Sequence, residues 1–151
     1  MPPFRRTAKG AAYQQLLDRA SEAMSGAFYL EAGWIIFALL EDRLNSVLRL
    51  TGGIPTDKNG RPIQMLGKKL RVARERLVTD DAVRKAMRLG RDLDQLERWK
   101  DRRNDLAHSM ANDARSWADL AEEASVLAAD GRALVGSISS AVMRLKKMKR
   151  R

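Results

Sequence analysis

The only histidine of the sequence lies in a short polar segment, Trp99-Lys100-Asp101-Arg102-Arg103-Asn104-Asp105-Leu106-Ala107-His108-Ser109. Within it, Arg103, Asn104 and His108 supply a cation, an amide and an imidazole. In a helix, Asn104 and His108 would share one face because they are four positions apart. Arg103 and His108 are five apart, about 140° around an ideal helix, so the arginine side chain would have to swing toward the histidine to share its cleft.

These three side chains suit the cleavage of RNA without a metal ion. RNA carries its own nucleophile, the 2′-hydroxyl beside each phosphate, so an enzyme has to supply a base, a proton donor and a cation. Histidine exchanges protons near neutral pH, since its ordinary pKa is about 6.5. Arginine stays charged and donates two parallel hydrogen bonds to phosphate, and asparagine could orient the imidazole or bind phosphate. The spacing alone is unspecific, because a lone histidine near a helix end is more often a structural or capping group.

One histidine supplies one proton carrier, whereas cleavage by a paired acid and base would use two. A symmetric dimer that places both copies of His108 in one groove supplies the second. We therefore predict a homodimer in which the two Arg103–His108 segments face a shared positive groove.

Composition limits the other kinds of site. The 151 residues fit one domain, and 44% hydrophobic with 32% charged residues indicate a folded, non-membrane chain. No cysteine is present, so disulfides and thiolate metal sites are excluded, and a single histidine does not supply the nitrogen and sulfur ligands of a usual zinc site. We expect neither a metal nor a cofactor.

The net charge of +10 is concentrated at the two ends. Residues 1–10 form a basic arm of +3 and residues 144–151 a basic tail of +6, which leaves +1 for the body. This distribution indicates a polyanion such as RNA as partner, although basic ends can also serve only solubility. The longest apolar stretch, residues 34–40, is far shorter than the ~20 residues that span a bilayer. With no secretory signal visible, we expect a cytoplasmic protein without a membrane partner.

Helical periodicity runs through the whole sequence, and no strand pattern is present. We predict helices over residues 8–25 and 28–50, a third from Pro62, a fourth capped by Thr79 or Asp80 and ending near His108, and a last over residues 114–148 capped at Asn112-Asp113. The expected fold is an all-α antiparallel bundle of four to five helices in a single domain, with residues 28–50 at its centre. Residues 51–62 form a glycine-rich loop that is either a flap over the cleft or a link. Three tryptophans occupy apolar helical positions and are predicted to be core: Trp34, Trp99 and Trp117.

The third predicted helix and its approach form the densest basic stretch outside the ends. Residues 58–76 hold seven basic side chains and one acidic one. Together with cations near the histidine, this stretch supplies our candidate RNA-binding residues: Lys68, Lys69, Arg71, Lys100 and Arg102.

The segment Arg103-Asn104-Asp105-Leu106-Ala107-His108 resembles the R-x4-6-H motif of the HEPN superfamily, in its form with a polar residue straight after the arginine. The apolar residues 29–45 also look like the long second helix of that superfamily, which often carries an acidic residue facing the motif. The resemblance implies a homodimeric, metal-independent endoribonuclease of the toxin or phage-defence type, for which a nucleotidyltransferase-type antitoxin is a possible partner.

The resemblance also implies roles for individual residues. His108 would carry the proton, Arg103 would bind the phosphate in the transition state, and Asn104 would position them. Glu41 is the first choice for an acid that orients Arg103, with Glu31 second, and Arg102 is an alternative motif arginine.

Other readings stay open because the superfamily includes members that bind nucleotides or proteins without cutting. A non-catalytic RNA binder would keep its function without His108. A protein-interaction module would be favoured by an exposed tryptophan. Membrane-surface binding through residues 144–151 lacks the large apolar face that it needs.

Overall fold

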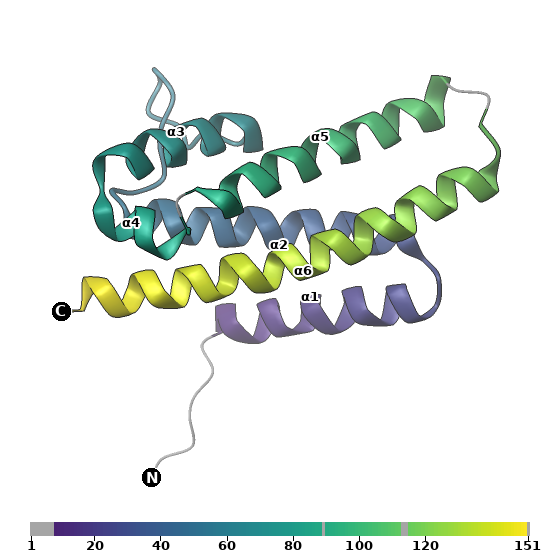
Figure 1. Cartoon of the computed structure of the whole chain (residues 1–151), viewed down its shortest axis with the longest axis horizontal. Helices are drawn as coiled ribbons and strands as arrows, with labels where there is room; N and C mark the ends of the chain where they lie inside the picture. Colours follow the sequence, from purple (N-terminus) through teal and green to yellow (C-terminus); the bar gives the residue numbers. More distant parts are fainter. Residues whose placement is uncertain (1–7, 89, 113–114, 151) are drawn as a thin grey trace, which may run out of the picture.

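The structure is a computed structural model, and it describes residues 8–88, 90–112 and 115–150. In this part of the chain all regular structure is helical, and Figure 1 shows the long helices running antiparallel along one axis. The elements are α1 (Ala8–Ser25), α2 (Tyr29–Leu50), α3 (Leu66–Thr79), α4 (Asp81–Ala86), α5 (Arg91–Asn112) and α6 (Trp117–Lys149). The predicted all-α bundle is confirmed.

The core is built around α2, as its all-round apolar character predicts. This helix contacts α1, α3 and α6, and five of its large aliphatic side chains have no exposed surface: Ile36, Leu39, Leu40, Leu44 and Leu48. Each such side chain contributes about 1.5–3 kcal/mol by leaving water. The most extensive packing is between α2 and α6.

A glycine lets three helices meet beside the candidate site. A Cβ on Gly131 of α6 would lie 2.6 Å from Nε1 of Trp99 in α5 and 2.7 Å from Cγ2 of Ile36 in α2. Trp99 is buried, and its Nε1 donates a hydrogen bond of 2.8 Å to the carbonyl oxygen of Leu127. Gly131 therefore marks a close contact between helices, whereas a Cβ on Gly136 would meet nothing within 4 Å.

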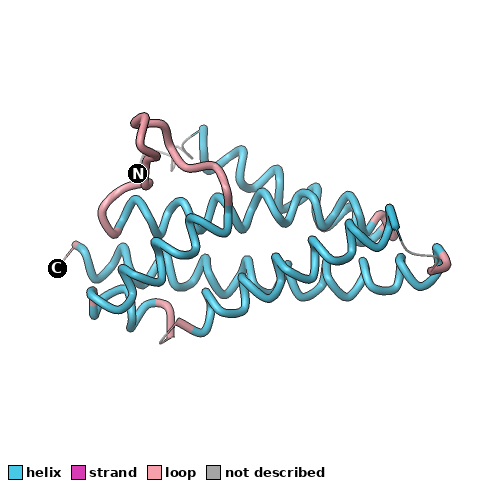
Figure 2. Tube along the Cα trace, turned by 90° about the horizontal axis from the view of Figure 1, so that it is seen from above, coloured by secondary structure: helices cyan, strands magenta, loops and turns pink. Residues whose placement is uncertain are grey.

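The third helix begins later than predicted. Pro62 pairs with Thr56 in an isolated antiparallel bridge, and α3 starts at Leu66. Asp57 explains the difference, because its Oδ1 accepts hydrogen bonds from the backbone N–H groups of Asn59 and Arg61 and holds the chain in a turn. Figure 2 shows this loop at the end of the bundle where the C-terminus lies, opposite the end of α5 that carries His108, so it is a link and not a flap.

The predicted fourth helix is two helices. Asp80 caps α4, as predicted, by accepting hydrogen bonds from the N–H groups of Ala82 and Val83. The helix ends at Ala86, and α5 begins only after Gly90, which has φ +86° and lies where a Cβ would meet Leu77 at 2.7 Å. The positive φ favours glycine here, and a side chain would also require Leu77 to move.

The last helix starts three residues later than predicted and ends within one residue of the predicted end. Its N-cap is Ser116, whose hydroxyl accepts from the N–H of Asp119 at 3.2 Å. Asp113 and Ala114, where the cap and start were predicted, lie outside the described residues. The supposed tail belongs to the helix, since α6 continues to Lys149, and Lys149 pairs with Asp80 at 3.2 Å. Of the described helices, α6 alone is long and apolar enough to cross a membrane, but its buried stripe packs against α2, α5 and α4, as in a core helix.

Two of the three tryptophans are not core residues. Trp99 is buried, but Trp34 is 73% and Trp117 64% exposed. Residues 34–40 are apolar on every side of α2, so the sequence pattern did not reveal which side is covered. The buried side is set by Ile36, Leu39 and Leu40, and Trp34 lies two residues before Ile36, about 200° around the helix.

Candidate active site

The segment with Arg103, Asn104 and His108 forms the last turns of α5. This helix is unbroken from Arg91 to Asn112, so the distortion that could have aimed Arg103 at His108 is absent from it. The two side chains therefore leave the helix about 140° apart. Within one chain, they do not converge on a common point.

Arg103 is held against α2. It is half-buried, and its guanidinium carbon lies 4.2 Å from the ring centroid of Phe37. Such a cation–π contact contributes about 0.5–1 kcal/mol. The N–H donors of the guanidinium have no hydrogen-bond partner among the described residues. Arg103 also lines an apolar groove of about 240 Å³ with Leu30, Trp34 and Met110.

Asn104 and His108 are both exposed on the other side of α5. The carbonyl oxygen of His108 accepts a hydrogen bond of 3.3 Å from Asn112, but its imidazole makes no hydrogen bond or ion pair within the described residues. The ring is thus neither a core group nor a cap. The side chain is exposed, so a substrate could reach it.

The proposed acidic partners of Arg103 are engaged elsewhere. Glu41 accepts a hydrogen bond of 2.9 Å from Lys69, whose side chain is only 4% exposed. Glu31 lies 3.8 Å from Arg19. The expectation that Glu41 or Glu31 orients Arg103 is therefore not met within a single chain, and the buried Lys69 belongs to an ion pair within the bundle, so it is not available to RNA.

The other candidate RNA-binding residues differ in whether they are exposed or already paired with an acidic residue. Lys68 and Arg71 are exposed on α3. Arg102 pairs with Asp130 at 2.8 Å, and the half-buried Lys100 lies 3.3 Å from Asp101. Fewer cations of the basic stretch over residues 58–76 are available to RNA than the sequence indicates. Arg76, for example, has a structural role, because it donates hydrogen bonds to the carbonyl oxygens of Leu48 and Gly53.

Exposed apolar side chains surround this end of the bundle. They come from the start of α2, the end of α5 and the start of α6, which lie together at the right of Figure 1. We call them the apolar patch: Phe28 (65% exposed), Leu30 (37%), Trp34 (73%), Met110 (43%) and Trp117 (64%). Soluble monomers rarely expose apolar groups in one large patch, so such a surface marks an interaction site. Sequence reasoning missed it because aromatic residues at helical spacing usually belong to the core.

No protein-family model, curated protein or solved structure matches this chain. The functional argument therefore depends on the residues and their geometry.

Proposed function

We propose that this protein is a metal-independent endoribonuclease that cuts RNA by 2′-hydroxyl attack at a site shared by two copies of the chain. One observation carries the proposal. Arg103 lines the groove of the apolar patch, and His108 lies on the same last turns of α5 but points about 140° away from it. Neither side chain has a hydrogen-bond partner among the described residues, although Arg103 contacts the ring of Phe37. A second copy docked on the patch would bring the two ends of α5 together and supply what each chain lacks.

In the proposed reaction, one imidazole removes the proton of a 2′-hydroxyl. The 2′-oxygen attacks the adjacent phosphorus, and the bond from phosphorus to the 5′-oxygen breaks. The second imidazole protonates that leaving oxygen, and a cyclic phosphate remains on the upstream fragment. Arg103 would bind the phosphate oxygens as negative charge develops, and the exposed Asn104 would orient the imidazole or the phosphate.

The resemblance to HEPN proteins supports the same assignment. It suggests a cytoplasmic toxin or phage-defence ribonuclease, with RNA as substrate and a nucleotidyltransferase-type antitoxin as a candidate partner. Lys68 and Arg71 would add positive charge for the RNA backbone.

A second candidate is a protein-interaction module without catalytic activity. The exposed Trp34 and Trp117 favour it, because aromatic residues dominate the binding energy of protein interfaces. In that case the apolar patch would bind a different protein and His108 would be dispensable.

The test is cleavage of labelled total RNA in the presence of EDTA. The wild-type protein should cut, and His108→Ala should lose about 10²–10⁴-fold in rate, which is the usual effect of removing a general acid or base. Asp105→Ala, an exposed change on the same helix, is the matched control and should cut normally. If neither the wild type nor His108→Ala cuts RNA, the endoribonuclease proposal is wrong.

A further inference from the structure

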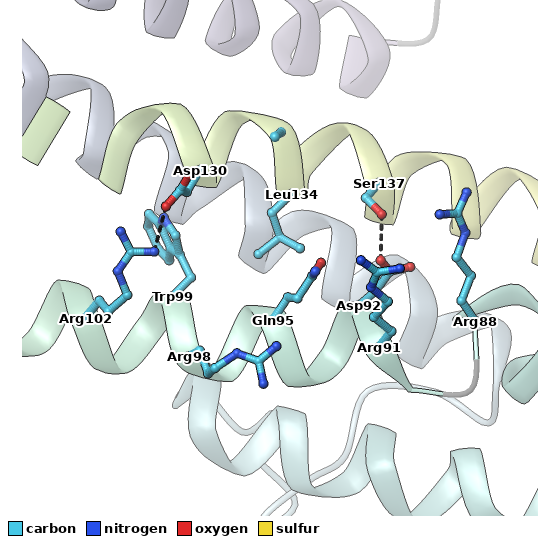
Figure 3. Close-up of a pocket in the computed structure, with 11 residues that line it drawn as sticks. Arg88, Arg91, Asp92, Gln95, Arg98, Trp99, Arg102, Asp130, Leu134 and Ser137 are labelled. Carbon is cyan, nitrogen blue, oxygen red and sulfur yellow. Dashed lines mark hydrogen bonds and ion pairs between the residues drawn. The ribbon is translucent and has the colours of Figure 1, made fainter. Parts of the chain in front are cut away.

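A second concave surface lies between α5 and α6, away from the apolar patch (Figure 3). It has a volume of about 500 Å³ and a mostly polar lining. Four arginines line it, from the chain just before α5 and from one side of that helix: Arg88, Arg91, Arg98 and Arg102. We call it the arginine groove.

The positive charge of the arginine groove is not balanced within the chain. Arg102 pairs with Asp130, but Arg88, Arg91 and Arg98 have no ion pair or side-chain hydrogen bond with any described residue. Three acidic residues of α5 are engaged elsewhere, since Asp94 and Glu97 pair with Arg74 and Asp101 with Lys100. Four arginines against the carboxylates of Asp92 and Asp130 leave the groove with a charge of +2.

A buried carboxylate adds a second kind of group to the groove. Asp92 is 1% exposed, and its Oδ1 accepts a hydrogen bond of 2.6 Å from the hydroxyl of Ser137. Its Oδ2 has no hydrogen-bond partner among the described residues. Leaving a buried carboxylate oxygen unpaired is unfavourable, and a hydrogen-bond donor on a ligand would remove this penalty. A ligand that fits the groove therefore combines negative charge with hydroxyl or amino donors.

The spacing of the arginines indicates an extended ligand. Arg91, Arg98 and Arg102 lie on one side of α5, with Gln95 between them (Figure 3). Eleven residues of helix separate the first from the last, which is about 16 Å. One phosphate group cannot reach all three, whereas successive phosphates of a strand can. Each guanidinium can donate two parallel hydrogen bonds to a phosphate.

We propose that the arginine groove binds the phosphates of single-stranded RNA outside the cleavage site. RNA has the required combination, because its ribose hydroxyls and base amino groups are donors for Asp92, whereas the carboxylates of an acidic peptide would be repelled by it. The groove leads along α5 to Arg102, the residue before Arg103. The choice of RNA rests on the proposed function, but binding here does not require cleavage.

Binding should be measured on the full-length His108→Ala protein, so that cleavage cannot interfere. The probe is a fluorescent single-stranded 12-nucleotide RNA, and the readout is its anisotropy over a range of salt concentrations. Adding Arg91→Gln and Arg98→Gln should weaken binding about tenfold or more and reduce the slope of log affinity against log salt by about 1.4, because two phosphate contacts are lost. Both arginines are exposed, so an unchanged melting temperature is expected and would show that the fold is intact.

The matched control is Lys146→Gln with Lys147→Gln, which removes the same charge from exposed positions near the end of α6. This pair should have a much smaller effect. Equal losses from both pairs would mean that only net charge matters and would overturn the proposal. So would a ribonucleoside monophosphate or inorganic phosphate that competes as strongly as the 12-nucleotide RNA, since the ligand would then be small.

The two proposals can fail separately. If wild-type protein does not cut RNA but the Arg91/Arg98 pair weakens binding, the endoribonuclease proposal fails and the arginine groove stands. If the wild type cuts and the pair binds RNA as tightly as its parent, the groove proposal alone fails.

Discussion

At the scale of single residues, the position of Arg103 matters more than its charge. Its guanidinium lies over the ring of Phe37, which restricts its direction, while the N–H donors along its edge stay available. Lysine would keep the charge but would lose both the stacking and the paired hydrogen bonds to phosphate. The chemistry proposed for Arg103 therefore depends on arginine and not on any cation.

This argument predicts the effect of Arg103→Lys. Its rate of RNA cleavage should fall about tenfold to a hundredfold, because a point charge replaces a fork of parallel donors. Arg49→Lys, an exposed change in the last turn of α2, is the control and should leave the rate unchanged. Full activity of Arg103→Lys would show that Arg103 acts only through its charge.

A second residue-scale prediction concerns Asp80 and pH. Partial burial alone would raise the pKa of Asp80, but hydrogen bonds from Lys149 and from the N–H groups of Val83 and Ala82 outweigh it and hold the pKa below 3.8. A lowered pKa in the folded state stabilises the protein above pH 3.8, and this contribution is lost as the pH falls through the lowered value. Asp80→Ala should cost about 1 kcal/mol at pH 7, as for other lost N-caps.

Urea denaturation at pH 7 and in steps below pH 4 measures this difference. The gap between wild type and Asp80→Ala should narrow as the pH falls, and Asp81→Ala, at an exposed neighbour, should show little change at any pH. A gap that stays constant down to the most acidic conditions would contradict the assigned hydrogen bonds.

At the scale of helices, the junction of α2, α5 and α6 positions the candidate site. Gly131 allows Trp99 and Ile36 to approach α6, and Trp99 lies one turn before Arg103 on α5. Gly131→Ala should destabilise the protein by about 1–3 kcal/mol through overpacking. Gly136→Ala, in the same helix but with open space around it, should instead stabilise by about 0.5–1 kcal/mol. Thermal unfolding of both variants checks this, and equal shifts in the same direction would show that α6 is not packed as described.

The sequence allowed the helices to be predicted, because apolar residues recur with the period of a helix. It did not show the break between α4 and α5, although Gly90 was a usable signal that the continuous apolar pattern obscured. The prediction that Trp34 and Trp117 belong to the core was wrong, because an apolar residue in a sequence does not show whether another helix covers it. The Glu41–Lys69 pair joins residues 28 positions apart, so only the packing of α3 on α2 could reveal it.

The candidate site was predictable in part. The types and spacing of Arg103, Asn104 and His108 identified the segment, but the directions of its side chains depend on how α5 meets α2. The arginine groove was not apparent from the sequence. Arg91, Arg98 and Arg102 line a groove only because α6 packs beside α5, where Ser137 of α6 donates a hydrogen bond to Asp92. Charge on one helix says little until the opposing surface is known.

At the scale of the whole molecule, the apolar patch and the divergent Arg103 and His108 point to one arrangement. If two chains pair through the patch, each cleavage site depends on groups from both. A chain that dimerises normally but lacks its imidazole should then inactivate a wild-type partner. If a single chain cuts RNA by itself, adding the inactive variant should not change the rate of the wild-type protein.

The most direct measurement is therefore RNA cleavage in EDTA by a fixed amount of wild-type protein mixed with increasing His108→Ala protein. At equal amounts the rate should fall to about half, because half of the wild-type chains are then paired with the variant. His108→Ala that also carries Trp34→Glu, which places a charge in the apolar patch, should not lower the rate. The account predicts suppression that requires an intact patch; a wild-type rate that is unchanged by any excess of His108→Ala, or no cleavage at all, would contradict it.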